Sequence, residues 1–415
     1  MAVSTDPIDG TRLKEQFPLL SRDVHGKPIV YLDSAATSQK PLSVLKAMDD
    51  YYRTINSNVH RGVYMIAEEA TNRMEIARAL VRDFIGARSS TEIIFTKNAT
   101  ESLNMVAQSW GRANLSAGDV VVLSHMEHHA NIVPWHMLVA EIGIQLRWIP
   151  LDAEGRLDLT DLDSLLDGAK VLSVTAMSNV LGTMNPVRTL TDAARKAGAI
   201  SIIDGCQSVP HSATNVQELG ADFLAFSGHK MCGPTGIGVL YGREELLEAM
   251  PPFLGGGEMI RDVRLDGFTT NDLPWKFEAG TPPIAEIIGL GAAVEWLNGV
   301  GMDNVRAHEI ALTEYTISTL QERFGDRIHI HGPSSPLERG GVFSFDFDGL
   351  HPHDISQVLD QHAVCVRAGH HCAKPLMKLL GIGATARASV YVYNDTADID
   401  ALADALDATG AFFTL

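Results

Sequence analysis

The sequence predicts an α/β fold, with a large domain built on a mostly parallel mixed sheet covered by helices and a smaller α+β C-terminal domain. Short apolar runs rich in β-branched residues alternate with amphipathic helical segments, which is typical of parallel strands buried on both faces. After Thr281 the pattern changes to long helices and one strand of alternating polarity. Because 415 residues exceed one usual core, we expect a large domain at 26–296 and a small domain formed by 1–25 with 297–415.

The expected strands of the large domain are short and continuously apolar. They lie at Glu92–Thr96, Val120–Ser124, Val171–Thr175, Ala199–Asp204 and Asp222–Phe226. The expected helices around them carry apolar residues on one face. They lie at Ile66–Phe84, Thr100–Trp110, Ile132–Ile142 and Leu190–Ala197. This order indicates a sheet covered by helices on both sides.

The C-terminal part mixes long helices with short strands. The helices are expected at Ile284–Trp296, Val305–Phe324, Ile355–Gln361 and Pro375–Leu380. The strands are expected at Val342–Phe347, at Ala363–Arg367 and in the apolar run that begins directly after Arg387.

Composition excludes several classes of partner. The chain has 33 basic and 51 acidic residues and a net charge of −18, which argues against binding to nucleic acid or to an anionic membrane. The first residues lack the basic and apolar regions of a signal peptide, and no apolar run reaches membrane-spanning length. The four cysteines show no CxxC spacing, so reduced thiols and a cytoplasmic location are expected.

Lys230 follows the predicted strand Asp222–Phe226 and precedes a glycine-rich turn. A lysine at a strand end is placed to be desolvated, which favours the neutral amine that can bind an aldehyde. Asp204 ends the preceding predicted strand. A lysine for the aldehyde and a carboxylate for the ring nitrogen are what pyridoxal 5'-phosphate (PLP) requires of a protein. We therefore predict a PLP site built on Lys230 and Asp204.

With these residues in place, the chain resembles the cysteine desulfurases of the SufS/Csd type, which form group II within the class-V aminotransferase family and have PLP fold type I. The resemblance runs from Tyr31-Leu-Asp-Ser-Ala-Ala-Thr37 to Arg387. Its motifs occur in order as Glu127-His-His-Ala-Asn-Ile-Val-Pro-Trp135, Ser227-Gly-His-Lys230, Glu278-Ala-Gly-Thr-Pro282 and Arg367-Ala-Gly-His-His-Cys-Ala373. Relatives commonly carry His at the position of Tyr64, so no role is predicted for Tyr64.

The resemblance also implies residues that bind the PLP ring. A histidine is expected to stack on the ring. Spacing alone leaves His128 and His129 open, and the order of the family motif favours His128. Gln207 lies three residues after Asp204, within reach of the ring's phenolic oxygen if the chain turns there.

The PLP phosphate needs hydrogen-bond donors. Thr100 opens a predicted helix, where a hydroxyl and the first free amides form an anion site. Ser227 and His229 are expected to donate as well. Thr281 resembles the residue that reaches the phosphate from the other subunit in this family, which implies a homodimer with shared sites.

Substrate and sulfur chemistry are expected on the C-terminal part. Arg387, helped by the amide of Asn179, is expected to pair with the substrate α-carboxylate. Cys372 lies on a short loop beside Arg367 and two histidines, and nearby cations lower a thiol pKa. The resemblance makes Cys372 the nucleophile that becomes a persulfide, with Arg367 orienting the loop and contributing to substrate binding.

These calls combine into a PLP-dependent L-cysteine desulfurase that passes sulfur to an acceptor for iron–sulfur cluster assembly. The alternatives are selenocysteine lyase, cysteine sulfinate desulfinase or another class-V PLP enzyme. The resemblance implies a zinc-containing SufU-type acceptor over a SufE-type one, because relatives that work with SufU-type acceptors carry a histidine at the position of His353, 19 residues before Cys372. Imidazole is a good zinc ligand, so His353 could replace a zinc-bound thiolate of the partner. The histidines of this region are too dispersed for a usual zinc site, so no intrinsic metal is expected.

Overall fold

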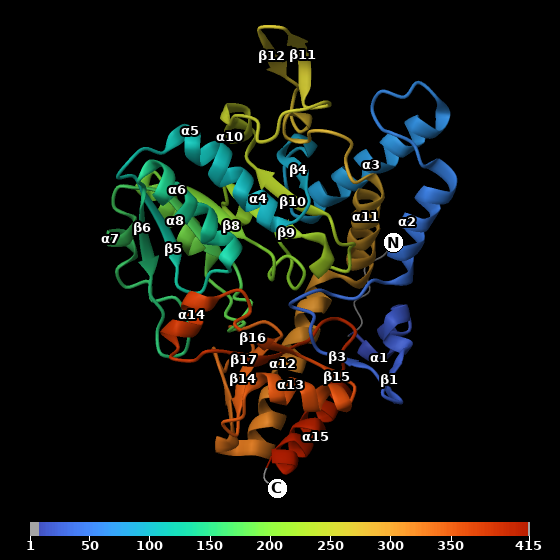
Figure 1. The fold of residues 1–415 in the computed structure, drawn as a ribbon, viewed down its shortest axis with the longest axis vertical. Helices are drawn as coiled ribbons and strands as arrows, with labels where there is room; N and C mark the ends of the chain where they lie inside the picture. Colours follow the sequence, from blue (N-terminus) through green and yellow to red (C-terminus); the bar gives the residue numbers. More distant parts are fainter. Residues whose placement is uncertain (1–7, 414–415) are drawn as a thin grey trace.

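The computed structural model describes residues 8–413, which form a large part and a smaller part that pack against each other (Figure 1). The large part is built on a seven-stranded sheet. In spatial order its strands are β4 (Ile93–Thr96), β10 (Gly238–Gly242), β9 (Phe223–Ser227), β8 (Ile200–Asp204), β7 (Ala169–Thr175), β5 (Val120–Ser124) and β6 (Gln145–Ile149). The strands from β9 to β6 are parallel, and β10 runs antiparallel to both of its neighbours.

Helices cover both faces of this sheet, as predicted. They are α2 (Leu42–Asp50), α3 (Met65–Phe84), α4 (Ala99–Met105), α5 (Arg112–Asn114), α6 (Val133–Ile142), α7 (Leu162–Leu166), α8 (Val187–Ala197), α9 (Val216–Leu219), α10 (Glu244–Ala249) and α11 (Ile284–Val300). Alternate residues of β5 enter different cores. Val120 and Val122 pack with α3, α8 and α11, whereas Val121 and Leu123 pack with α4 and α6.

Strand β10 is not among the predicted strands, yet it determines how the edge of the site is built. It returns the chain from the Lys230 turn and lies between β9 and β4. A Cβ atom on Gly238 would lie 2.5 Å from the Cα of Asn98, so only glycine allows this close approach. The end of β9 is therefore held beside the start of α4.

The smaller part has a four-stranded antiparallel sheet packed against long helices. Its strands, in spatial order, are β13 (Ile328–Ile330), β14 (Val342–Phe347), β17 (Thr385–Ser389) and β16 (Arg367–Gly369). Its helices are α1 (Gly10–Lys14), α12 (Met302–Phe324), α13 (Pro352–Gln361), α14 (Lys374–Leu379) and α15 (Thr396–Phe413). Phe343, Phe345 and Phe347 alternate along β14 and enter one core with α12, α13 and α15.

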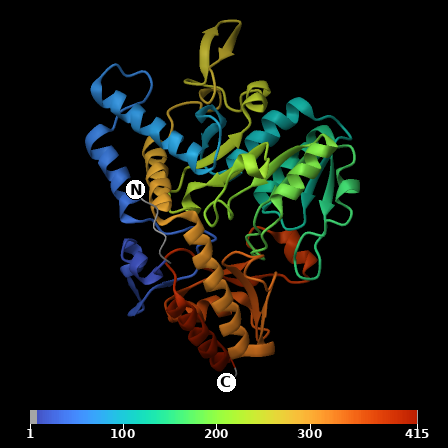
Figure 2. The same cartoon turned by 180° about the vertical axis from the view of Figure 1, so that it is seen from behind.

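The two parts are joined twice. In Figure 2, α11 and α12 follow one another from the large part into the smaller one. Near the N-terminus, β3 (Val30–Tyr31) pairs in parallel with β15 (Val364–Cys365). Short hairpins complete the fold, formed by β1 (Asp23–Val24) with β2 (Lys27–Pro28) and by β11 (Ile260–Arg264) with β12 (Gly267–Thr270). The predicted domain boundaries remain predictions.

Three predicted elements differ from the structure. The strand predicted at Ala363–Arg367 is divided into β15 and β16, which belong to different sheets. Arg387 lies inside β17 and not before a strand, because Thr385–Ser389 pairs with both β14 and β16. The helix predicted at Thr100–Trp110 is present as α4 followed by a π-helical turn at Val106–Gly111.

Candidate active site

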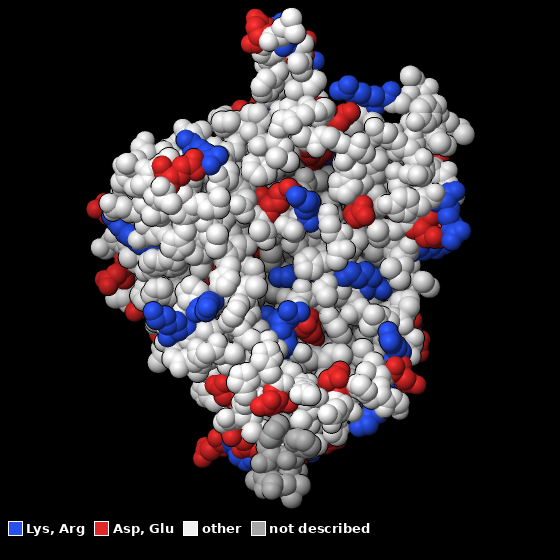
Figure 3. All heavy atoms as spheres, viewed as in Figure 1, with Lys and Arg blue, Asp and Glu red and all other residues white. Residues whose placement is uncertain are grey.

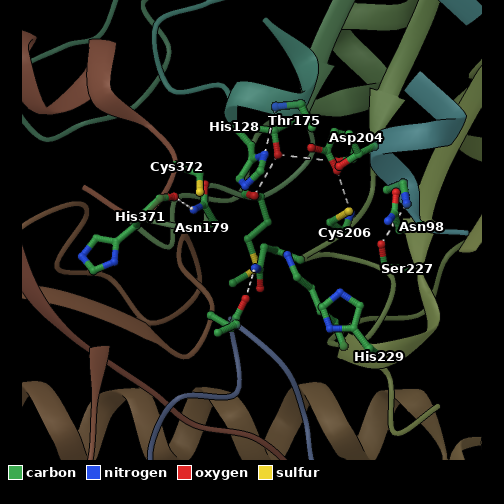
Figure 4. Close-up of a pocket in the computed structure, with 18 of the residues that line it drawn as sticks. Asn98, His128, Thr175, Asn179, Asp204, Cys206, Ser227, His229, His371 and Cys372 are labelled. Carbon is green, nitrogen blue, oxygen red and sulfur yellow. Dashed lines mark hydrogen bonds between the residues drawn. The ribbon is translucent and has the colours of Figure 1, made fainter. Parts of the chain in front are cut away.

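A cavity of about 280 Å³ lies between the two parts, where the carboxyl ends of β7, β8 and β9 meet loops of the smaller part. In parallel sheets these strand ends are where ligands bind. Most predicted site residues line this cavity, and Figure 4 shows several of them pointing toward one another. Those that line it are Thr100, His128, Asn179, Asp204, Gln207, Ser227, His229, Lys230, Arg367, Cys372 and Arg387.

Asp204 and Gln207 lie side by side at the end of β8. Asp204 is only 3% exposed, and its Oδ1 accepts a hydrogen bond of 2.9 Å from the Cys206 amide. Gln207 donates through Nε2 to the carbonyl of Ala35, and its buried Oε1 has no hydrogen-bond partner within residues 8–413. Cys206 also lines the cavity, and burial raises the pKa of its thiol, so it stays protonated. A buried carboxylate and an unpaired polar atom thus face one space.

Of the two adjacent histidines His128 and His129, His128 lines the cavity. Its Nδ1 accepts a hydrogen bond of 3.0 Å from the Ala130 amide, so its proton must sit on Nε2. Burial, and next the charge of Lys230, lower its pKa to about 4, and the ring is neutral at pH 7. His129 does not line the cavity and instead contacts the cysteine loop, so the geometry favours His128 for the predicted ring contact.

Lys230 ends a short 3₁₀ turn, Gly228–Lys230, directly after β9. The turn is held through the carbonyl of His229, which accepts hydrogen bonds from the Thr37 hydroxyl at 3.0 Å and from Lys40 Nζ at 3.1 Å. Burial lowers the pKa of Lys40 to about 8. Sequence reasoning missed Lys40, because no motif links it to a turn 190 residues further along the chain.

Two of the predicted phosphate donors, Thr100 and Ser227, lie at the start of α4. Asn98 caps this helix by accepting a bond of 3.0 Å from the Glu101 amide. The Ala99 amide donates to Ser227 Oγ at 2.9 Å, which leaves the Ser227 hydroxyl hydrogen able to donate toward the cavity. Thr100 is in the first turn of the helix, where amides have no intrahelical partner. These groups are donors suited to an anion.

Two arginines of the smaller part share one carboxylate. Arg367 and Arg387 are cross-strand partners on β16 and β17, and both donate to Asp33, at 3.0 and 3.3 Å. One negative charge between two positive charges leaves a surplus positive charge. Arg387 is 2% exposed, its Nε has no hydrogen-bond partner within residues 8–413, and burial lowers its pKa to about 10. A second carboxylate would restore the balance.

Cys372 is exposed on a loop with unusual backbone geometry. His371 and Cys372 have φ values of 50° and 56°, the left-handed region that costs non-glycine residues about 1 kcal/mol each. Such a turn persists only where neighbours hold it. Asn179 Nδ2 donates to the His371 carbonyl at 2.7 Å, and the His129 amide donates to the Cys372 carbonyl at 2.7 Å. Asn179, predicted to contact substrate, thus also holds the cysteine loop.

Two predicted site residues lie outside the cavity. Thr281 is exposed in the loop before α11. His353 is exposed in the first turn of α13, and its ring stacks on that of His351 with centroids 5.3 Å apart. The structure of one chain tests neither the predicted contact across subunits nor the predicted acceptor contact.

Sequence reasoning also missed Asn98 and Thr175 as lining residues. It placed His371 beside Cys372 as a cation, but burial lowers the pKa of His371 to about 3, so this histidine is neutral. The motif Tyr31–Thr37 contained Asp33, but nothing in it indicated a carboxylate shared by two arginines. Within residues 8–413, no group of three or more His, Cys, Asp or Glu side chains could hold a metal ion. In the same range no single helix could span a membrane; α11 and the helical segment 302–327 qualify only together, with a bend of 72°.

Comparison with known proteins places this architecture in a family. A model of the class-V aminotransferases matches residues 30–402, and the chain therefore belongs to that family. It is 51% identical to a probable cysteine desulfurase of Streptomyces coelicolor, with 98% of each chain covered. A probable cysteine desulfurase of Halalkalibacterium halodurans is 50% identical, with 98% of this chain and 99% of that one covered.

Solved structures agree. A cysteine desulfurase from Thermococcus onnurineus superposes with a TM-score of 0.93 at 41% identity, covering 99% of this chain and 100% of that one. The cysteine desulfurase CsdA from Escherichia coli superposes with a TM-score of 0.89 at 38% identity, covering 98% and 100%. The predicted family resemblance and fold type are confirmed, and the roles of individual residues remain predictions.

Proposed function

We propose that the protein is a PLP-dependent cysteine desulfurase that converts L-cysteine to L-alanine and carries the released sulfur as a persulfide on Cys372. One observation carries the proposal: an exposed cysteine on a held left-handed turn lines the same cavity as a strand-end lysine and a pair of arginines, of which Arg387 is buried. Relatives named cysteine desulfurase at about half identity over the full chain support it.

The residues of the large part fit PLP. Lys230 would bind its aldehyde, Asp204 would hold its ring nitrogen, and Thr100, Ser227 and His229 would donate to its phosphate. Gln207, with a buried polar atom in need of a partner, adjoins the same space. When bound, PLP supplies an electron sink for bond breaking next to the substrate Cα. Neutral His128 can pack against a ring without the cost of burying a charge.

The substrate carboxylate would be the second anion for the arginine pair. Arg387 presents a buried guanidinium, and Asn179 still has one amide hydrogen to offer beyond the one that it donates to His371. Figure 3 shows Lys and Arg side chains gathered between the two parts, on a chain whose net charge is −18. A local positive field favours entry of a small anionic substrate.

The sulfur step is a thiol-exchange reaction. The Cys372 thiolate attacks the substrate sulfur, the sulfur–carbon bond breaks, and its electron pair stays with the carbon fragment. That carbon then takes up a proton to complete alanine, and Lys230 is placed to move protons at the substrate Cα. The outer sulfur on Cys372 is then the atom transferred.

We also propose a cytoplasmic homodimer in which Thr281 completes the partner's phosphate site. The sulfur would pass to an acceptor for iron–sulfur cluster assembly. His353 favours a SufU-type acceptor over a SufE-type one, because an exposed imidazole can replace a zinc-bound thiolate of the partner on docking. In that case His353→Ala keeps basal alanine release and loses the stimulation by a SufU-type protein. Full stimulation of His353→Ala, with unchanged binding, would contradict the exchange.

Selenocysteine lyase, cysteine sulfinate desulfinase and other class-V activities remain the alternatives, and a transaminase has no use for Cys372. The deciding experiment is mass spectrometry of the holoenzyme after addition of L-cysteine, together with an alanine assay. One added sulfur on the peptide that contains Cys372, with alanine released, supports the proposal. Alanine without added sulfur on Cys372 would refute the persulfide.

A further inference from the structure

His129 makes two hydrogen bonds to the backbone directly after Cys372, although it is not part of the cavity wall. Its backbone amide donates to the Cys372 carbonyl at 2.7 Å. Its ring nitrogen Nε2 accepts a hydrogen bond of 2.9 Å from the backbone amide of Lys374. One residue of the large part therefore holds the two peptide groups that flank the residue after Cys372.

The second of these bonds caps a helix. Lys374 is the first residue of α14, and amides in a first helical turn have no intrahelical partner. The usual partner is a polar side chain at the position before the helix. That position is Ala373, which has no such side chain. The imidazole of His129 supplies the acceptor from another part of the chain.

The loop needs this support. His371 and Cys372 are both in the left-handed region, a backbone conformation that is unfavourable for residues other than glycine. Asn179 holds the loop on the N-terminal side of Cys372, through the His371 carbonyl. His129 holds it on the C-terminal side. Without the His129 ring, the Lys374 amide loses its acceptor, and the C-terminal side of the loop keeps only the bond from the His129 backbone amide and the packing of α14.

We propose that His129 is a positioning residue for sulfur transfer, whose neutral imidazole caps α14 and thereby holds Cys372 toward the cavity. This inference deepens the proposed function and rests on it. The ring touches neither the cavity nor the thiol, so its effect is on the position of Cys372 and not on the binding of cysteine.

The cap requires an unprotonated Nε2, since an imidazolium has no acceptor nitrogen. Burial, and then the nearby His370 and Lys374, lower the pKa of His129. The His370 ring lies 5.8 Å away and the His128 ring 6.3 Å away, and no acidic side chain is in ring or hydrogen-bond contact with His129 within residues 8–413. The surroundings therefore keep the acceptor available at neutral pH.

The test compares three substitutions in the holoenzyme. His129→Gln keeps a neutral acceptor of similar reach. His129→Phe keeps a ring without an acceptor, and His129→Asn keeps a polar group that is too short to reach Lys374. Lys374→Ala is the matched control, since it removes a side chain and leaves the backbone donor in place.

The first readout is the rate at which iodoacetamide alkylates Cys372 in the absence of substrate, followed by peptide mass spectrometry. Cys365, partly buried in β15, is the internal reference. We expect His129→Phe and His129→Asn to raise the Cys372 rate about fivefold, the effect of one lost helix cap. His129→Gln and Lys374→Ala should stay within about twofold of the parent, by the same measure.

The second readout is alanine release. His129→Phe and His129→Asn should lower kcat about fivefold with KM for cysteine unchanged, and His129→Gln should restore kcat. Parent-like alkylation and kcat in both His129→Phe and His129→Asn would overturn the proposal, as would a His129→Gln variant as impaired as His129→Phe. If His129→Phe does not fold, His129→Asn decides. If the parent releases no alanine, the proposed function fails while alkylation still tests the cap.

Discussion

The cavity takes its reactive side chains from two regions that differ in how their backbone is held. We call them the floor, which lies at strand ends, and the cysteine loop. The floor, Asp204 and Ser227–Lys230, lies at the ends of parallel strands, and Asp204 is 3% exposed. The loop, His370–Lys374, is a short turn with two strained residues, and Cys372 is exposed. The floor is fixed by the sheet, whereas the loop is fixed by a few hydrogen bonds from the large part.

This difference matches what each region has to do under the proposed function. Breaking bonds at carbon requires groups that are held fixed in a site that excludes water, where charge interactions are strong. A sulfur atom that must be handed to another protein requires a carrier that reaches solvent. A rigid floor and a lightly held loop allow one cavity to serve both needs.

The largest expected effect comes from breaking the floor. Lys230→Ala should lower alanine release by at least about 10³-fold, because the group that binds the aldehyde and moves the proton is lost. Some PLP should remain bound without a covalent bond, measured by absorption and by release on denaturation. The exposed Lys196→Ala is the control and should keep full activity. Alanine release by Lys230→Ala at the parent rate would refute the assignment.

Removing the Cys372 thiol should leave the binding of L-cysteine at the floor unchanged. Cys372→Ser should lower alanine release from cysteine about 10²-fold or more, because the sulfur has no acceptor thiolate. The visible absorption change on adding L-cysteine should persist. Selenocysteine, with a weaker bond to carbon, should lose less rate. Cys365→Ser should match the parent, and equal losses on both substrates would count against the thiolate role.

Arg367 and Arg387 lie between the two regions, and we expect their substitution to have a smaller effect, on KM for cysteine. Arg387→Lys should raise KM for cysteine about 10- to 100-fold, since lysine cannot make the paired contact with a carboxylate. Arg367→Lys should raise it less, because Arg367 is exposed and charge there is screened. Steady-state kinetics measure both. A larger effect at Arg367 would reverse the assignment of the buried arginine.

The smallest expected effect concerns pH and the floor. The pKa of His128 is lowered from 6.5 to about 4 in the folded protein, chiefly by burial. Below pH 6.5 the unfolded chain binds a proton that the folded chain refuses, so the free energy of unfolding falls with falling pH, by about 2 kcal/mol at pH 5. His128→Asn keeps a capping acceptor but does not titrate, and it should lose less. Urea unfolding at pH 7 and pH 5 measures this, and equal losses would contradict it.

Sequence reasoning predicted the floor better than the loop. Lys230 and Asp204 follow apolar runs, and parallel strands place such ends together by a general rule. Gln207 and Ser227 followed from their distance along the chain. The contacts of Lys40, Asp33 and His129 could not be predicted, since each joins segments more than 150 residues apart. The division of Ala363–Arg367 between two sheets was hidden for the same reason.

The segment from Val30 to Lys40 makes strand pairing and hydrogen bonds with both the smaller part and the Lys230 turn. Its start pairs with β15, its middle bonds Arg367, Arg387 and Ser389, and its end supports the carbonyl next to Lys230. Ala35 and Ser389 are 354 residues apart. In the order of synthesis, His229 comes 189 residues after Lys40, and Arg387 comes 354 residues after Asp33. A nascent chain that has not yet emerged as far as Ser389 lacks β17, so the lining of the cavity by Arg387 is completed only after that strand has been made.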